Sequence, residues 1–288
     1  MSYNVKPIKF EEAFKRLKTR KEIGSRMTSK QWAALPAAIR DRSFFASRVA
    51  SARFLSSAKK MLEDFMLGTK EEVISPDGVK SIAFKTGGRA DFVKKMQDFA
   101  IAEGMGDPLP EGVGRGDRGV IPETRDISSN RRLKLVYDTN IRSSYGYGNF
   151  EASVDPAITN VYPAWRFIRT GVVKEPRPLH KRFEGAVRRK DDTKFWLEMN
   201  KKEIGGLGVP HGPWGFNSQM DVQEVGRREA ESLGLIKKNQ KIRSPKSAFN
   251  KKLSVSEKRM DSGIFKKLKK AMGAKMKLSA GKLLWARK

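Results

Sequence analysis

The chain contains no cysteine, and that absence excludes several classes of chemistry at once. Disulfide bonds, thiol nucleophiles, iron–sulfur clusters and cysteine-based zinc sites all need this residue. Histidine is almost as scarce, because His180 and His211 are the only two in the sequence and cannot build a three-histidine metal centre. The protein is therefore expected either to work in a reducing compartment or to be insensitive to redox conditions.

Long apolar runs are missing as well. No segment approaches the roughly 18 apolar residues that a membrane-spanning helix needs, so we expect no stable membrane insertion. The first 18 residues carry acidic side chains and lack an apolar core, which is not the pattern of a secretory signal peptide. Hydrophobic residues still make up 38% of the chain, which predicts a packed core rather than full disorder.

Negative charge is scarce beside positive charge, because 60 lysine and arginine residues face 32 acidic ones and leave a net charge of +28. Residues 236–288 concentrate this excess, with 18 basic residues against two acidic ones, a net charge of +16. The rest of the chain holds 42 basic and 30 acidic residues, a net charge of +12. Such a basic segment predicts a polyanionic partner, since lysine and arginine neutralise phosphates without reading sequence. A solvated, disordered tail that only keeps the chain soluble is the alternative.

The basic tail contains the residues that we expect to bind double-stranded DNA non-specifically. Part of it has a helical pattern starting at Asp261, with Phe265 and Leu268 on one face and lysines on the other. A basic amphipathic helix can lie on anionic lipid, dock into a partner groove or bind phosphate backbones, and the sequence leaves these three uses open. The expected DNA contacts are Lys237, Lys238, Lys241, Arg243, Lys246, Lys251, Lys252, Lys258, Arg259, Lys266, Lys267, Lys269 and Lys270.

Residues 1–103 carry mostly helical periodicity and predict a helical N-terminal region. Pro36 is expected to break one helix, and Gly68 to end the longest one as its C-cap. A hairpin is expected where Pro76-Asp77-Gly78 interrupts an alternating stretch. The predicted helices span residues 7–18, 28–36, 41–67 and 89–103, and the hairpin spans 72–85.

Residues 104–123 are rich in glycine and proline and predict a linker. The segment after it predicts a small mixed α+β domain over residues 124–235, followed by the basic tail, largely disordered or helical, over 236–288. The fold class is therefore α+β. The first expected element of this domain is a helix that Ser128-Ser129 caps and that Gly146 and Gly148 loosen. It is followed by a strand within 161–173, an irregular loop over 205–220 and a closing helix over 224–233.

Six segments of this C-terminal region resemble, in order, conserved segments of a known family. The first, Asp138-Thr-Asn-Ile-Arg-Ser-Ser-Tyr-Gly-Tyr-Gly148, is similar to the family's helix motif. Another, Lys190-Asp-Asp-Thr-Lys-Phe-Trp196, is similar to its Asp-Asp-x-x-(Phe/Ile)-Trp segment. The family is that of the Mu F-like minor head proteins of tailed bacteriophages, also called phage head morphogenesis proteins. The resemblance covers about 110 residues, and its other segments are 162–169, 175–185, 208–220 and 225–235.

The resemblance implies a non-enzymatic minor head protein that acts near the portal in head assembly or in DNA packaging or delivery. Its implied partners are the portal or major capsid protein, and its implied location is the phage head interior or procapsid, after assembly in the bacterial host cytoplasm. Many relatives have paired cysteines in the closing loop, where this chain has Asn217-Ser-Gln-Met220, so neither a metal nor a cofactor is expected. The family-motif positions are Asp138, Asn140, Arg142, Tyr145, Gly146, Tyr147, Gly148, Trp165, Arg177, His180, Gly185, Asp191, Asp192, Trp196, Phe216, Asn217, Glu229 and Gly234.

A three-part mechanism follows from this interpretation. The apolar helix faces within residues 8–67 would anchor the chain to a head or portal subunit. Residues 124–235 would form a rigid module, and the tail would hold the protein against DNA or an acidic lumen surface by charge alone.

Three alternatives remain open at this point. A metal-dependent nuclease could use both histidines together with Glu175, Asp191 and Asp192. A cationic toxin could act on membranes through the helix over residues 261–278. The tyrosines at 145 and 147 could stack on bases instead of packing in the core.

Overall fold

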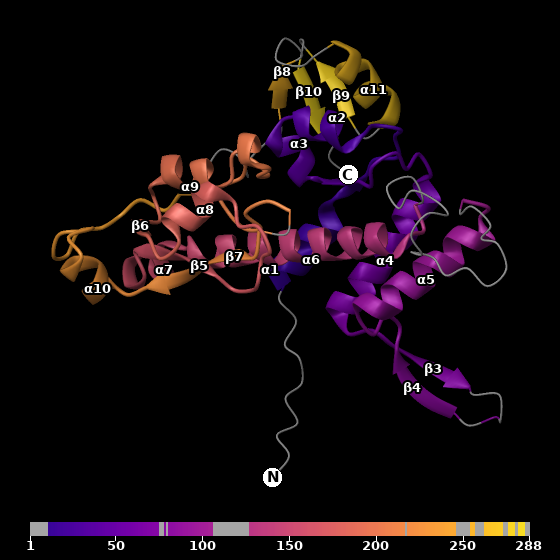
Figure 1. Cartoon of the computed structure of the whole chain (residues 1–288), viewed down its shortest axis with the longest axis horizontal. Coiled ribbons are helices and arrows are strands. Elements are labelled where there is room, and N and C mark those ends of the chain that lie inside the picture. Colours follow the sequence, from indigo (N-terminus) through magenta and orange to yellow (C-terminus); the bar gives the residue numbers. More distant parts are fainter. Residues whose placement is uncertain are drawn as a thin grey trace.

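The computed structural model in Figure 1 describes residues 11–74, 78, 80–105, 127–216, 218–245, 254–256, 262–272, 276–279 and 282–285. Helices and small sheets alternate along these ranges, which confirms the predicted α+β class. Within the same ranges, no helix combines the length and the apolar character that a bilayer crossing requires.

The N-terminal region is helical, as predicted. Two short helices lie on either side of Pro36, so the break occurs where the sequence analysis placed it. The first of the two begins after Thr28, which forms a capping box with Gln31. The helices are α1 (Glu11–Thr19), α2 (Ser29–Ala34), α3 (Ala37–Asp41), α4 (Ala52–Leu67) and α5 (Arg89–Ala102).

The helix predicted over residues 41–67 is wrong in its first third. Helix α4 begins at Ala52, where the Ser51 hydroxyl accepts a hydrogen bond from the Phe54 N–H (3.1 Å). The preceding residues leave the helical path because β2 (Ser43–Phe44) pairs in parallel with β1 (Lys21–Glu22). The end of the helix agrees with the prediction, since Gly68 caps it in the left-handed conformation with φ 60°.

The first hydrophobic core gathers the apolar faces of α1, α4 and α5. Leu17, Leu55, Leu62 and Phe92 are all fully buried in it. The apolar faces of α1 and α4 lie within residues 8–67, which were expected to anchor the chain on another subunit. That expectation is wrong for these two helices, because their apolar faces are already covered within the chain.

Helix α6 (Asn130–Ser153) is the longest helix of the described chain and begins at the N-cap Ser129. It lies along α1 and joins two cores, contributing Tyr137 to the first and Phe150 to the second (Figure 1). The predicted loosening at Gly146 does not occur, since the helix runs on through both glycines. The division into domains at residue 124 stays a prediction.

The second core covers one face of a three-stranded antiparallel sheet with the order β6-β5-β7. Its strands are β5 (Ala164–Arg169), β6 (Val187–Arg189) and β7 (Met220–Val225). Strand β5 lies within the strand predicted over 161–173. The accompanying helices are α7 (Pro156–Val161), α8 (Pro178–Phe183), α9 (Thr193–Met199), the short 3-10 helix η1 (Lys202–Ile204) and α10 (Arg227–Ser232).

The closing helix was expected to begin at residue 224, and the structure corrects this start. Residues 220–225 form β7, which pairs with the whole of β5, from Ala164 opposite Val225 to Arg169 opposite Met220. The helix begins only at Arg227, because the backbone groups of the preceding residues are used in the sheet. Gly234 follows its end with φ 68°.

The predicted hairpin is confirmed. Strands β3 (Lys70–Ile74) and β4 (Lys80–Phe84) pair antiparallel and extend away from the body beyond α4 and α5 (Figure 1). Most of the predicted linker, from residue 106 to 123, lies outside the described ranges, as do residues 7–10 of the predicted first helix.

The described parts of the tail contain one helix and three strands. Helix α11 (Ser262–Met272) agrees with the helical pattern found in the sequence. The strands were not predicted: β8 (Ser254–Ser256), β9 (Met276–Ser279) and β10 (Lys282–Trp285) form an antiparallel sheet with the order β8-β10-β9.

Candidate functional site

The irregular loop before β7 is held in place by one buried amide, that of Asn200. Its side chain hydrogen-bonds four main-chain groups: Nδ2 donates to the carbonyl oxygens of Val209 (3.0 Å), His211 (2.9 Å) and Pro213 (3.2 Å), and Oδ1 accepts from the N–H of Leu207 (2.7 Å). Asn200 is fully buried directly after α9, so this helix sets the path of the loop. The sequence analysis missed this residue, because no periodic pattern distinguishes a single asparagine at a helix end.

The same loop touches α6 at a pair of glycines. A β-carbon at Gly146 would lie 2.1 Å from the carbonyl oxygen of Gly212 and 2.5 Å from its carbonyl carbon. Only glycine therefore allows the loop backbone to approach the helix this closely. This contact gives a physical reason for one glycine of the family motif, which the sequence analysis had interpreted as a loosening of the helix.

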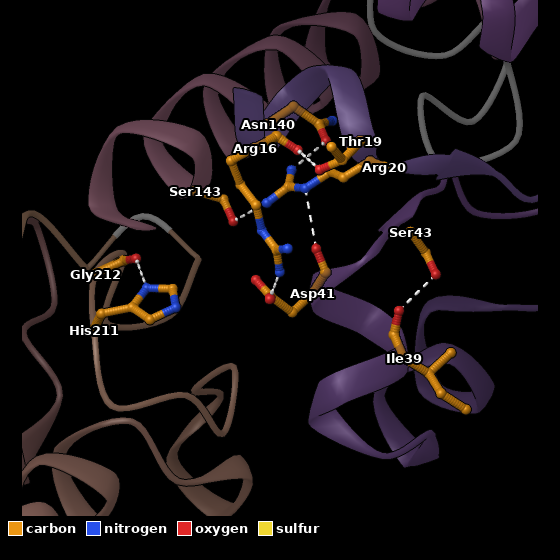
Figure 2. Close-up of polar contacts among 10 residues, drawn as sticks. All are labelled: Arg16, Thr19, Arg20, Ile39, Asp41, Ser43, Asn140, Ser143, His211 and Gly212. Carbon is orange, nitrogen blue, oxygen red and sulfur yellow. Dashed lines mark hydrogen bonds and ion pairs between the residues drawn. The ribbon is translucent and has the colours of Figure 1, made fainter. Parts of the chain in front are cut away.

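A buried arginine directly after α1 ties the end of that helix to α6 (Figure 2). The Arg20 guanidinium donates to Asn140 Oδ1 (3.1 Å), to Ser143 Oγ (2.6 Å) and to the carbonyl oxygen of Asp41 (3.1 Å). Burial lowers the pKa of Arg20 to about 10, so it remains charged at neutral pH. The motif residue Asn140 therefore acts as a structural acceptor inside the protein.

A second buried arginine lies one helical turn away. Arg16 forms an ion pair with Asp41 (Figure 2). Its guanidinium carbon lies 4.3 Å from the ring centroid of Tyr147. Burial is the main cause that lowers the pKa of Arg16 to about 9. The spacing of Arg16 and Arg20, four residues apart with Arg16 inside α1 and Arg20 directly after its end, is a sequence signal that the analysis overlooked.

His211 closes this cluster from the loop side (Figure 2). Its Nδ1 donates to the carbonyl oxygen of Gly212 (2.7 Å), and the ring lies 5.6 Å from Tyr147 and 5.4 Å from Phe150 between centroids. Burial, with a smaller contribution from the positive charges of Arg16 and Arg20, lowers the pKa of His211 to about 3. The imidazole is therefore neutral at physiological pH and packs as an aromatic ring.

His180 is also buried, in α8. Its Nε2 donates to the carbonyl oxygen of Met199 (2.8 Å), and its ring lies edge-on to Phe167. Burial lowers the pKa of His180 below its usual value. Among the described residues, no three His, Cys, Asp or Glu side chains come close enough together to hold a metal ion. The proposed set of two histidines with Glu175, Asp191 and Asp192 is therefore not brought together.

The Asp-Asp and tryptophan positions of the family motif have structural roles. Asp192 caps α9 by accepting from the Phe195 N–H (3.1 Å), and Asp191 pairs with Arg189 (2.8 Å). Trp165 and Trp196 pack edge-to-face, with 5.2 Å between ring centroids. These two rings belong to the second core.

Other motif positions fix turns and surface contacts. Arg177 donates to the carbonyl oxygens of Ile204 (2.6 Å) and Phe216 (2.8 Å) and so fastens the start of the loop to its end. Gly185 has φ 82°, a conformation that favours glycine. Glu229 pairs with Arg166 across the sheet edge.

A few motif side chains reach the surface of α6 and the loop. Asp138, Arg142 and Phe216 line a shallow pocket together with Leu207 and Pro213. The Asp138 carboxylate pairs with Arg89 (3.0 Å), and Arg142 donates to Gln219 Oε1 (3.0 Å). Tyr145 is 37% exposed and Gly148 is buried, whereas Asn217 lies outside the described residues.

The structure describes only part of the predicted DNA-binding set. In α11, Phe265 and Leu268 are buried, whereas the four lysines of the same helix, Lys266, Lys267, Lys269 and Lys270, are exposed. Lys237, Lys238, Lys241 and Arg243 lie in the first part of the tail, after α10, and Lys246, Lys251, Lys252, Lys258 and Arg259 lie outside the described residues. The amphipathic division predicted for this helix is confirmed for its described side chains.

Comparison with known proteins gives one clear similarity. A stretch of 110 residues is 27% identical to part of capsid assembly protein F of Escherichia phage Mu. The chain is thus similar to a phage capsid assembly protein. The matched stretch is 38% of this chain and 22% of the Mu protein, so the chain spans about a fifth of that relative's length. No family model matches the chain, and no solved structure matches it.

Proposed function

We propose that this protein is a head morphogenesis protein of a tailed phage or prophage, with a structural role in capsid assembly. The observation that carries the proposal is the similarity to capsid assembly protein F of phage Mu, 27% identity over 110 residues. The family-motif segments found in the sequence point the same way.

The environment of the motif residues supports a non-enzymatic role. Asn140, Trp165, Asp192 and Trp196 cap helices, accept internal hydrogen bonds or pack in the core. Both histidines have pKa values lowered by burial and donate to main-chain carbonyl groups. Residues that serve in this way stabilise a rigid module, which is what an assembly component needs to present a defined surface.

In finer detail, we place the protein in the head interior or procapsid near the portal, with the portal or major capsid protein as its partner. Assembly takes place in the bacterial host cytoplasm. The basic tail contacts packaged double-stranded DNA through its phosphates. The +16 charge of residues 236–288 and the exposed lysines of α11 support this assignment.

Quantitative mass spectrometry of purified virions and of DNA-free procapsids from the source phage tests the assembly role. A few copies of this chain in both particles are expected for a minor head component. Presence in procapsids alone would identify an assembly factor that leaves before maturation. Absence from both particles contradicts the proposal.

The lysine face of α11 is expected to carry a measurable share of DNA affinity. Each phosphate neutralised on B-DNA contributes about 0.9 to the slope of log affinity against log salt. The variant with Lys266, Lys267, Lys269 and Lys270 all changed to Gln should therefore have a slope shallower by roughly 3 to 4 and bind at least about tenfold more weakly at low salt. Fluorescence anisotropy with duplexes of unrelated sequence at several salt concentrations measures both quantities.

A control variant removes the same charge elsewhere. Lys60, Lys94, Lys134 and Lys181 are exposed lysines of the body, and their change to Gln lowers the net charge by the same four units. We expect a much smaller change in slope for this variant. Equal losses for both variants would mean that net charge alone, and not the tail, governs binding.

A further inference from the structure

The hairpin formed by β3 and β4 is the most exposed regular element among the described residues. All ten of its residues are exposed, and Figure 1 places the hairpin outside the helical body. Its large apolar side chains are far from covered: Ile74 is 62% exposed, Ile82 75% and Phe84 48%. Exposed apolar groups gathered in this way mark an interaction surface more often than a random surface feature.

These three side chains share one face of the hairpin. Ile82 and Phe84 alternate along β4, and Ile74 lies on the same side because it pairs with Lys80. The Glu72 carboxylate pairs with Lys80 on this face (2.8 Å), and Lys70 Nζ lies 5.2 Å from the ring centroid of Phe84. In the described chain, neither strand has a further strand beside it. A two-stranded hairpin is only marginally stable by itself, so a third strand or a covering layer would stabilise it.

We propose that the hairpin is a dimerisation surface, on which β4 pairs antiparallel with β4 of a second copy of this chain, centred on Ile82. In this register Ile82 lies opposite Ile82 of the second copy, and Lys80 lies opposite Phe84. The result is a four-stranded sheet with the order β3-β4-β4-β3, in which the exposed apolar side chains of both copies lie on one face.

Charge and side-chain complementarity favour a second copy of this chain as the partner, and β4 as the strand through which it pairs. The β4 register places no like charges opposite each other and brings a second lysine to the Phe84 ring, repeating the contact that Lys70 already makes within the hairpin. Symmetric pairing through β3 is less favourable. Centred on Glu71 or Glu72, it would place identical carboxylates opposite each other, and centred on Val73 it would set Glu72 against Ile74.

The natural absence of cysteine allows a direct test on the full chain. Ile82→Cys introduces a single thiol, and directly opposed residues of an antiparallel pair have Cα atoms about 4.5–5.5 Å apart, within the range of about 4.4–6.8 Å that disulfides bridge. Mild oxidation should therefore convert most of this variant into a covalent dimer. Ile74→Cys is the matched control, because it is exposed on the same face but lies on the outer strand, at least three strand spacings or roughly 14 Å from its equivalent.

Equal cross-linking of both cysteine variants would indicate random collision and overturn the proposal, as would the absence of cross-linking at Ile82→Cys. Sedimentation of the cysteine-free chain provides an independent readout. We expect a dimer for the natural sequence and at least a tenfold weaker association for Ile82→Lys, whose opposed charges repel, with an unchanged thermal unfolding midpoint. Val172→Lys, at a position that is 99% exposed outside the hairpin, should remain dimeric. A monomeric natural chain at tens of micromolar, or a dimer that survives Ile82→Lys, would exclude this interface.

Discussion

Replacing Gly146 by alanine is expected to destabilise the folded protein by about 3 kcal/mol or more. At an exposed position inside a helix, changing glycine to alanine stabilises the helix by roughly 1 kcal/mol. The effect expected at Gly146 therefore has the opposite sign to the one that helix propensity alone predicts. The reason is the contact with Gly212, whose carbonyl oxygen would lie 2.1 Å from the new β-carbon. Both groups belong to backbone that is fixed on either side, by α6 and by the loop held at Asn200, so neither can move away cheaply.

Urea unfolding monitored by tryptophan fluorescence measures this effect, because Trp214 lies in the same loop and is fully buried. Gly87→Ala serves as the control, since a β-carbon there meets no atom closer than 4.0 Å. We expect that control to change the free energy of unfolding by less than about 0.5 kcal/mol. A stabilised Gly146→Ala variant would show that the loop does not pack on α6 as the structure has it.

Replacing Asn200 by alanine is expected to have an effect of similar size, about 3–5 kcal/mol, because it leaves several buried main-chain groups without their partner. Three carbonyl oxygens and one N–H lose their hydrogen bonds to this side chain. Asn200→Asp is expected to be nearly as damaging, since a carboxylate accepts from the Leu207 N–H but offers no donor to the three carbonyl groups. If alanine and aspartate at position 200 lower the free energy of unfolding by similar amounts, the amide group is identified as the source of the stability.

The measurement is again the free energy of unfolding, combined with limited proteolysis of residues 205–220. The loop should become cleavable in both variants before the rest of the chain unfolds. Asn160→Ala is the matched control, because Asn160 is exposed and its side chain only accepts from Arg227 (3.0 Å). An Asn200→Ala protein as stable as this control would contradict the assigned role.

Much of the local structure could be predicted from the sequence because its causes are local. The capping residue Ser129, the break at Pro36 and the left-handed cap at Gly68 act within one helical turn, and all three are found where the pattern placed them. The alternation around Pro76-Asp77-Gly78 likewise predicted the hairpin. The amphipathic division of the tail helix followed from spacing alone.

The wrong boundaries arose where backbone groups pair with distant strands. Residues 43–44 have a helical pattern around them, yet their backbone pairs with residues 21–22. Residues 224 and 225 were assigned to a helix, yet they complete a sheet with β5, some 60 residues earlier in the sequence. A local pattern cannot contain this information, because the partner that satisfies the backbone lies far away in the chain.

By itself, the sequence determined the α+β class, the helix caps at Ser129 and Gly68, the concentration of positive charge in the tail and the resemblance to phage head proteins. Only the tertiary structure decided what the motif residues do. Arg20 meets Asn140 across 120 positions of sequence, and the Gly146 contact with Gly212 turns an expected weak point of α6 into a packing site. The physical reason is that buried polar groups and close backbone contacts need partners in three dimensions, and one-dimensional periodicity reports only which face of an element is apolar.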